Sequence, residues 1–524
     1  MPVAAQVLRH ASDHPHRLAV CGPAGELSYA ELARRIRDAA AHLTAPGVAA
    51  PGLTGSGLGG GAPAGPGLGG GAVAAPGPGR GVQAGPGLAR GALVAISLAD
   101  PVDQLIAALA TDLAGGTPLL CDPTWDERVR AAIPADRHLD SLPPAGANDV
   151  LSSAEAGEWS SAEAGERPSA ETGTLIPHTA KWPDPEDGDR AWACFSSGST
   201  GRPRAVVRTR VSWTASFPWL SELAGIGPGD VVLVPGPLGS SLYGFAAVHA
   251  LAVGATALVP GRWSPGALGE QLGRATVAHL VPHCLPAVLD ALEEGAPLRT
   301  VVIGGAALPA GLRERAADAG VRVVSYYGAT ELSFVAADVD GAGLRPFPGV
   351  ELQVRALPGQ TLGEVWARSP WLAEGYLAGA AGPLRVDGDG WMSVGDVAEP
   401  YLPGEVLRLR GRGDGAIQTG GATVVPEDVE EVLRSVRGVG DVVVVGSPHP
   451  DLGAVVTAIV EVGAGTPPSR ASLEAVARGG LAAAQRPRRW YAVDSLPRTS
   501  AGKPARGLLT ARLAGGDPDL WRLT

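Results

Sequence analysis

Cysteine is scarce in this sequence, and basic residues are outnumbered by acidic ones. The four cysteines lie far apart and form no C-x-x-C pair, which excludes a disulfide framework and a zinc knuckle. They are Cys21, Cys121, Cys194 and Cys284. The net charge of −11 argues against a nucleic-acid-binding protein, because a phosphate backbone requires basic surfaces. We therefore expect a cytoplasmic protein with reduced thiols and no nucleic-acid partner.

Neither a leader peptide nor a membrane span is expected from the sequence. Residues 1–17 contain no apolar core of the kind that signal peptides carry. Residues 231–261 contain no Asp, Glu, Lys or Arg and are long enough to cross a bilayer. Prolines and glycines at 235–239 interrupt this run. It therefore predicts a strand, a turn, a buried helix and a second strand, and no membrane span.

Glycine, at 75 residues, and proline, at 47, are abundant, and much of the excess lies in two repeats. One repeats every ten residues from Gly57 to Gly91, and the other every eight from Ser152. Neither can bury enough apolar surface to offset the entropy lost on ordering. We expect disordered insertions over 46–92 and 146–186 in a folded body.

Outside these insertions, helices and strands alternate. A capping box at Ser28 and Glu31 opens a helix over 28–43. Further helices are predicted at 101–113, 242–251 and 265–274, and strands at 92–98, 118–121, 231–234, 255–259, 279–281, 301–303 and 322–325. This alternation is typical of an α/β domain with helix-flanked sheets.

The pattern changes past residue 410. A helix at 426–437, with a proline in its first turn, precedes strands at 442–445 and 455–462. We therefore predict a large N-terminal α/β domain over 1–410 and a small α+β C-terminal domain over 411–524.

The segment FSSGSTGRPR at 195–204 combines hydroxyl side chains, glycines and two arginines. Glycines let a backbone approach a bulky anion, and successive N–H groups with Ser and Thr hydroxyls form an anion site. The segment is not a Walker motif, since no Gly-Lys-Ser/Thr occurs. Two interpretations remain open at this point, a polyphosphate loop or a Ser/Gly-rich surface turn.

Further segments carry residues suited to nucleotide chemistry. YYGATE at 326–331 follows the last predicted strand of the alternating series, at the carboxyl end where open sheets bind ligands. Thr330 can contact phosphate, and the Glu331 carboxylate can hold Mg²⁺. The Asp396 carboxylate can accept both ribose hydroxyls. Lys503 is one of few lysines in an arginine-rich chain. Taken singly, each is better explained as a turn, a strand end or a solvated surface residue.

In this order and spacing, the segments resemble the adenylate-forming superfamily of acyl- and aryl-CoA synthetases, nonribosomal adenylation domains and luciferases. FSSGSTGRPR resembles its phosphate loop and YYGATE its aromatic-Gly-x-Thr-Glu motif. GRGDGAIQTGGATVVPEDVE at 411–430 is similar to its hinge motif, and LPRTSAGK at 496–503 to its C-terminal lysine motif. The hinge segment looks most like that of aryl-CoA and o-succinylbenzoate–CoA ligases.

The resemblance implies a two-step reaction. A small carboxylic acid attacks the α-phosphate of MgATP, giving an acyl-adenylate and pyrophosphate. A thiol, either CoA or the phosphopantetheine of an acyl carrier protein, then takes the acyl group. The small domain is expected to be mobile and to rotate about a hinge near Asp414 between the two steps.

The same resemblance implies residue roles. The ATP-binding residues would be Ser196, Ser197, Gly198, Ser199, Thr200, Gly201, Arg204, Gly305, Tyr327, Gly328, Asp396 and Arg412. The catalytic residues would be Lys503, Thr330 and Glu331, with Glu331 also holding the metal. Gly420 and Gly421 would line the thiol tunnel, and Leu242, Tyr243, His283 and Tyr326 the acyl pocket.

The sequence departs from the family pattern at several positions. Arg204 stands where relatives carry lysine, and Gln418 replaces the usual lysine of the hinge motif. No Asp lies at 239–244 to hold an ammonium group, so an α-amino acid is not expected as substrate. Three hypotheses follow: an acid–CoA ligase for an aryl or short acyl acid, an enzyme that loads a carrier protein, and a nucleotide-binding homologue that has lost catalysis.

Overall fold

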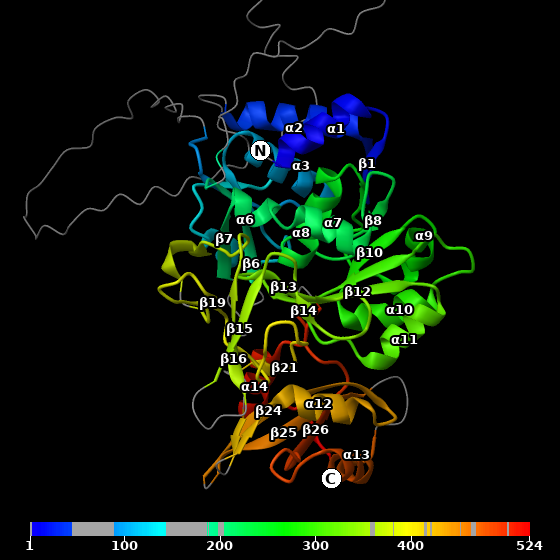
Figure 1. Ribbon diagram of the computed structural model, residues 1–524, viewed down its shortest axis with the longest axis vertical. Coiled ribbons are helices and arrows are strands. Elements are labelled where there is room, and N and C mark those ends of the chain that lie inside the picture. The colour runs from blue at the N-terminus through cyan, green and yellow to red at the C-terminus, as the bar shows by residue number, and fades with distance from the viewer. Residues whose placement is uncertain are drawn as a thin grey trace, which may run out of the picture.

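The computed structural model contains a large body and a smaller domain at its lower end (Figure 1). The residues that the structure describes are 3–44, 88–142, 186, 188–196, 204–356, 362–380, 382–412, 417–419, 422–450, 452–462, 468–499 and 502–523. The predicted insertions therefore lie almost wholly outside the described residues.

A nine-stranded mixed sheet forms the centre of the large domain. Its order is β14-β13-β12-β11-β10-β8-β9-β1-β2, and neighbours from β12 to β1 run parallel. The strands are β1 (Leu18–Gly22), β2 (Gly25–Ser28), β8 (Val231–Leu233), β9 (Thr256–Leu258), β10 (Val277–Leu280), β11 (Thr300–Ile303), β12 (Arg322–Ala329), β13 (Ser333–Asp338) and β14 (Arg345–Pro346). The helices in this part of the chain are α7 (Phe217–Ala224), α8 (Ser241–Ala252), η1 (Pro265–Ala267), α9 (Leu268–Leu272), η2 (Pro282–Cys284), α10 (Leu285–Asp290) and α11 (Ala310–Asp318). The apolar run 231–261 folds as β8, α8 and β9, as predicted.

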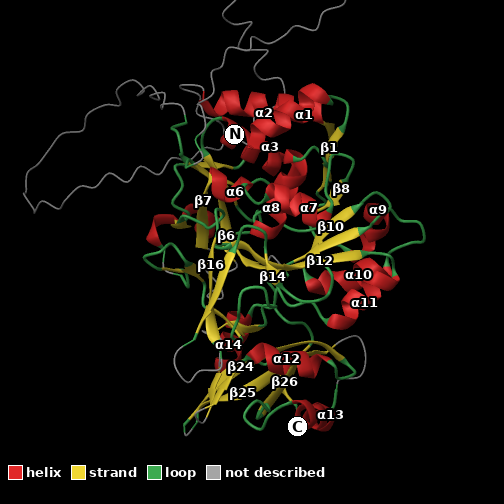
Figure 2. Ribbon diagram, viewed as in Figure 1, coloured by secondary structure: helices red, strands yellow, loops and turns green. Residues whose placement is uncertain are grey.

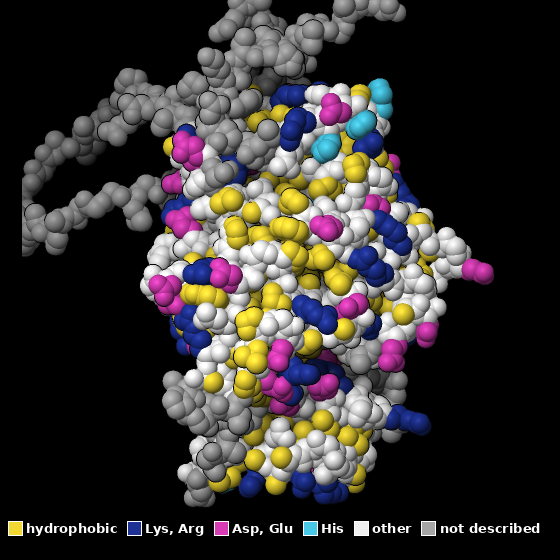
Figure 3. Space-filling view, in the orientation of Figure 1, with side chains coloured by type: hydrophobic (Ala, Val, Ile, Leu, Met, Phe, Trp, Pro, Cys, Tyr) yellow, Lys and Arg dark blue, Asp and Glu magenta, His cyan; other side chains and the backbone are white. Residues whose placement is uncertain are grey.

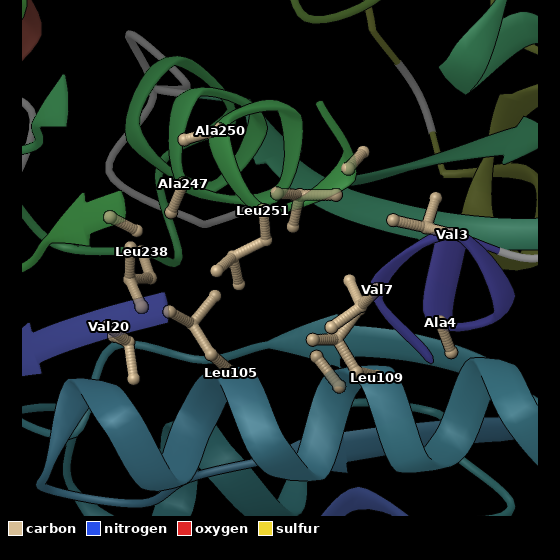
Figure 4. Packing of buried hydrophobic residues seen from close by; sticks show 14 of the residues in the cluster. Val3, Ala4, Val7, Val20, Leu105, Leu109, Leu238, Ala247, Ala250 and Leu251 are labelled. Carbon is tan, nitrogen blue, oxygen red and sulfur yellow. The ribbon is translucent and has the colours of Figure 1, made fainter. Parts of the chain in front are cut away.

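A second, six-stranded sheet has the order β17-β7-β6-β4-β3-β5. Its strands are β3 (Leu93–Ile96), β4 (Thr117–Leu120), β5 (Arg137–Leu139), β6 (Arg190–Ser196), β7 (Arg204–Thr209) and β17 (Gly375–Tyr376). The helices that accompany it are α1 (Val3–Asp13), α2 (Tyr29–Thr44), α3 (Pro101–Leu113), α4 (Glu127–Ala131) and α6 (Arg210–Thr214). Leu105 and Leu109 of α3 face Val7 of α1 and Leu251 of α8 in the largest apolar core (Figure 4).

A third sheet, which sequence patterns did not predict, follows from residue 351. Its order is β18-β19-β16-β20-β21, with β15 paired to β16, and all its pairings are antiparallel. The strands are β15 (Glu351–Arg355), β16 (Gly363–Arg368), β18 (Arg385–Val386), β19 (Met392–Ser393), β20 (Asp396–Ala398) and β21 (Leu409–Arg412), with the short helix η3 (Leu377–Gly379). The alternation of Glu364, Trp366 and Arg368 with small or apolar residues along β16 is the period-two signal in the sequence that could have indicated it.

The small domain has its own sheet and core. The order β23-β22-β25-β26-β27, with β24 paired to β25, joins β22 (Ile417–Thr419), β23 (Ala422–Val424), β24 (Val439–His449), β25 (Gly453–Val462), β26 (Arg489–Val493) and β27 (Trp521–Arg522). Its helices are α12 (Pro426–Arg434), α13 (Arg470–Gly480) and α14 (Arg506–Ala514). α12 lies against β24 (Figure 2), and Val429, Leu433, Val442 and Val444 belong to the same apolar core. The predicted α/β large domain and small α+β domain are therefore confirmed as the fold class.

Two predicted elements need correction. The helix expected over 265–274 is shorter, consisting of η1 and α9 only. The strand expected to end at 325 continues to Ala329, because β12 pairs antiparallel with β13 beyond the parallel core. YYGATE is therefore mostly strand, and only its last two residues leave the sheet. Within the described part of the chain, no helix combines the length and apolarity that crossing a bilayer requires.

Acid pH is expected to destabilise the large domain through two buried histidines. Burial lowers the pKa of His249 on α8 to about 4 and that of His279 on β10 to about 3. The unfolded chain then binds more protons than the folded one below the ordinary histidine pKa of about 6.5. Stability should fall by about 1.4 kcal/mol per pH unit from each histidine as pH drops from 6.5 toward these values. Urea unfolding from pH 7.5 to 4.5 measures the slope. His249→Gln should make it shallower, and an unchanged slope would contradict the assignment.

Candidate active site

A cleft of about 2040 Å³ separates the two domains. From the large domain it is lined by the carboxyl ends of β10, β11 and β12 and by the start of α8. From the small domain it is lined by α12, by β24 and by the turn that precedes α14. The carboxyl ends of parallel strands are where open α/β sheets bind ligands. The cleft is therefore the candidate active site.

Lys503 of the small domain reaches the large domain at Gly305. A Cβ placed on Gly305 would lie 2.8 Å from Lys503 Cε and 3.4 Å from its Nζ. Gly502 lies equally close to His283, since a Cβ on Gly502 would be 2.3 Å from the His283 ring. Both glycines have positive φ, of 92° at Gly305 and 80° at Gly502. Only residues without a Cβ allow this turn to insert between His283 and the end of β11.

Hydrogen bonds fix the turn that carries Lys503. The Thr499 backbone N donates to Lys503 O at 2.7 Å, and Lys503 N donates to Thr499 Oγ1 at 3.2 Å. Arg498 anchors its start through Asp441 at 3.1 Å and Glu461 at 2.8 Å, both on the small-domain sheet. These hydrogen bonds and ion pairs therefore fix the turn from which Lys503 projects into the cleft.

The predicted nucleotide residues come together at the end of β12. The Tyr327 hydroxyl donates to Asp396 Oδ2 at 2.8 Å, although 69 positions separate the two residues. The Thr330 and Ser241 hydroxyls lie 2.8 Å apart. Glu331 is buried, and its Oε1 accepts a hydrogen bond of 2.8 Å from the Tyr376 hydroxyl. The structure therefore brings Tyr327, Asp396 and Thr330 into the lining of the cleft, with Glu331 buried next to Thr330 in the chain.

The close approach of β12 and β13 leaves no room for a side chain at Gly328. A Cβ there would lie 2.0 Å from Ser333 O, where β12 and β13 approach each other across a bulge. The glycine therefore allows the two strands to close directly beside Tyr327.

Arg208, on β7, is a site residue that sequence reasoning missed. Its guanidinium is buried and donates to Ser212 Oγ at 2.9 Å, to Trp371 O at 2.7 Å and to Thr330 O. Burial lowers its pKa to about 10, and nearby carboxylate charge on Glu331 opposes that shift. The signal available in the sequence was a charged residue, Arg208, within the mostly apolar segment AVVRT at 205–209.

The predicted phosphate loop joins two strands that end at the cleft. Ser196, the last residue of β6, pairs in register with Arg204, the first of β7, and Phe195 lines the cleft. Residues 197–203 lie outside the described residues, as do Asp414, Gly420 and Gly421. Arg412, on β21, pairs in backbone register with Asp396 on β20. The predicted roles of this set stay predictions.

Two tyrosines of the predicted acyl pocket, Tyr243 and Tyr326, pack against glycines. A Cβ on Gly236 would be 2.1 Å from the Tyr243 ring, and one on Gly304 would be 2.2 Å from the Tyr326 ring. Burial raises the pKa of both tyrosines, so their hydroxyls stay neutral. Leu242 and His283 also line the cleft, and burial lowers the His283 pKa.

Charged side chains gather where the two domains meet, on the face seen in Figure 3. Arg410, on β21, pairs with Glu399 of the large domain and lies 3.6 Å from Asp428 at the start of α12. Glu427 packs against Gly411, where a Cβ would be 2.2 Å from its Oε2. Burial raises the pKa of Glu427. These contacts hold the small domain in the orientation that brings Lys503 to Gly305.

Comparison with known families agrees with this architecture. A model described as AMP-binding enzyme matches residues 80–377, and one described as AMP-binding enzyme C-terminal domain matches 428–503. The chain belongs to the AMP-binding enzyme family. This confirms the predicted adenylate-forming superfamily and the class of an ATP-dependent, AMP-forming acid ligase.

Several members of the AMP-binding enzyme family are similar to this chain. YhfT, an uncharacterised acyl-CoA ligase of Bacillus subtilis, is 34% identical over 60% of this chain and 66% of its own length. A feruloyl-CoA synthase of an Amycolatopsis species is 28% identical over 96% of this chain and 98% of its own.

Solved structures show the same fold. ATP-bound MatB from Rhodopseudomonas palustris has a TM-score of 0.73 at 23% identity, covering 98% of this chain and 99% of that one. The amide bond synthetase McbA from Marinactinospora thermotolerans has a TM-score of 0.72 at 26% identity, covering 98% of this chain and 99% of that one.

Proposed function

We propose that this AMP-binding enzyme joins a small carboxylic acid, aryl or short acyl, to CoA through an acyl-adenylate. The observation that carries the proposal is the contact of Lys503, from the small domain, with Gly305 beside the β12 end. There the ammonium group can approach both the acid carboxylate and the α-phosphate of ATP. Negative charge accumulates between these groups in the transition state, and a fixed cation stabilises it.

The remaining residues position ATP for this attack. Tyr327 and Gly305 flank adenine, Asp396 and Arg412 hold the ribose, and Thr330 contacts the α-phosphate. The β- and γ-phosphates are held by Ser196 to Gly201 and by Arg204, whose guanidinium replaces the ammonium of relatives. Most of the rate enhancement in such transfers comes from positioning and charge neutralisation.

The residues present fit a Mg²⁺ ion bound with the nucleotide. Mg²⁺ sites with phosphates use one or two carboxylates and leave the other positions to phosphate oxygens and water. Glu331 supplies one carboxylate, which is buried and oriented by the Tyr376 hydroxyl. When bound, the metal would neutralise phosphate charge.

The lining of the cleft and the names of the relatives limit which acids and which acceptor thiol the enzyme is proposed to use. Aromatic side chains surround the acyl pocket, and relatives named feruloyl-CoA synthase and 2-succinylbenzoate–CoA ligase act on acids with a ring. A pantetheine thiol is proposed to enter past Gly420 and Gly421 after the small domain rotates about Asp414. The buried free cysteines fit the cytoplasmic location predicted from the sequence.

Acid-dependent exchange of pyrophosphate into ATP tests the first step, and release of AMP with acyl-CoA tests the second. We expect both with an aromatic acid and CoA. Exchange without acyl-CoA formation, together with loading of a phosphopantetheine carrier, would replace CoA by a carrier protein. ATP binding without exchange for any acid would contradict ligase activity and favour a homologue that has lost catalysis.

A further inference from the structure

We propose that His279 determines acid specificity by hydrogen bonding to an uncharged polar substituent, a hydroxyl or a carbonyl, on the ring end of the substrate. This inference rests on the proposed function and extends it from an acid in general to a ring-bearing monocarboxylic acid with a neutral polar group.

The strand register places His279 on the wall of the acyl pocket. His279 on β10 is the partner of Val302 on β11, and Val302 is the partner of Val324 on β12. Side chains alternate along a strand, so Tyr326, two residues past Val324, lies on the same face as His279. α8 packs on this face and contributes Tyr243 and Phe245 to the cleft lining, which also includes His279.

Four aromatic side chains line the cleft in the same part of the large domain, and the His249 imidazole lies near enough to lower the His279 pKa. Phe245 contacts Trp213 with ring centroids 5.1 Å apart and Phe334 at 5.3 Å, and Phe334 contacts Tyr326 at 4.7 Å. All four of these side chains line the cleft. Such a wall suits the faces and edges of a planar ring, while giving a polar substituent little to bind except His279.

The imidazole of His279 is short of a partner. The residue is 2% exposed, and its Nε2 makes no hydrogen bond with any residue that the structure describes. Buried polar atoms are nearly always paired, and one left alone costs free energy. A substrate oxygen reaching Nε2 would satisfy it. His249 is partly satisfied, since its Nε2 lies 2.9 Å from Ser221 Oγ and 3.2 Å from Phe217 O, while its buried Nδ1 also makes no hydrogen bond with a described residue.

The electrostatics of the acyl pocket near His279 favour an uncharged substituent on the substrate. Burial lowers the His279 pKa to about 3, so the ring is neutral at physiological pH. The guanidinium of Arg208, which also lines the cleft, already donates to Ser212 Oγ, Trp371 O and Thr330 O. A second carboxylate would therefore be buried without a matching cation, at a high desolvation cost.

Matched acids test this inference. Pyrophosphate exchange gives kcat/KM for benzoic and 3-phenylpropenoic acids with and without a ring hydroxyl, and for malonic and 2-succinylbenzoic acids. Wild-type enzyme should favour at least one hydroxylated acid over its parent by about tenfold or more, because a site built for a hydrogen bond rejects the analogue lacking it. His279→Phe should bring that ratio close to one, and His279→Asn should retain part of it.

The control is His10→Gln, a change at a histidine of α1 that hydrogen-bonds to Ala252 O and is not among the described residues lining the cleft. It should leave the ratio unchanged. The inference is overturned if His279→Asn and His279→Phe keep the wild-type ratios for every pair, or if a dicarboxylic acid is the best substrate. If a variant fails to fold, the wild-type ratios still decide, because a wild-type enzyme without preference for any hydroxylated acid contradicts the inference. Exchange with none of the acids would instead overturn the ligase proposal, and the role of His279 with it.

Discussion

Replacing Lys503 with alanine is expected to lower the rate of acyl-adenylate formation about a hundred- to a thousandfold, the size of effect seen when one preorganised charge-stabilising group is removed. The structure places this ammonium group against Gly305, in the cleft that Thr330 also lines. Pyrophosphate exchange with a saturating acid measures the loss.

The second half-reaction should be spared in the same variant. Thioester formation from a synthetic acyl-adenylate and CoA is proposed to use another orientation of the small domain, in which Lys503 has left the cleft. Arg512→Ala is a suitable control, because Arg512 pairs with Asp517 within the small domain. It should change neither half-reaction. Equal losses in both half-reactions for Lys503→Ala would refute a role confined to adenylation.

Replacing Arg208 with methionine should lower both stability and adenylation. The substitution leaves Thr330 O and Trp371 O without their donor and the buried Glu331 carboxylate without its neighbouring cation. Breaking a buried charge arrangement by removing one partner costs about 3–5 kcal/mol of unfolding free energy. Adenylation by the folded variant should fall by about tenfold or more, because Thr330 and Glu331 lose a fixed position. Urea unfolding and pyrophosphate exchange, the latter well below the melting temperature, measure the two effects.

Arg210 offers a matched control two residues away. It is as buried as Arg208, and its Nη1 atom lies 2.7 Å from Oδ1 of Asp112 on α3. Arg210→Met should lose comparable stability but keep adenylation per folded molecule, since the Arg210–Asp112 pair is not among the described residues lining the cleft. If both variants lost adenylation equally, the role of Arg208 would be structural only.

Local patterns were sufficient for most of the large domain. The helices α2, α3 and α8 and the buried strands of the central sheet follow from apolar periodicity and capping, which neighbouring residues determine. The antiparallel sheet from β15 to β21 did not follow, because β18, β19 and β20 are only two or three residues long and β16 pairs with β19 and β20 across intervening chain. The extension of β12 to Ala329 also depends on a partner, β13, that supplies its hydrogen bonds.

For the site, the sequence by itself determined the residue types, their order and hence the family, because motif spacing survives without knowledge of contacts. Only the tertiary structure decided which of these residues meet. Tyr327 and Asp396, Lys503 and Gly305, and the buried guanidinium of Arg208 beneath Thr330 are brought together by sheet register and by the orientation of the small domain. The unpaired nitrogen of His279 is likewise a property of packing, since it depends on what surrounds the ring on every side.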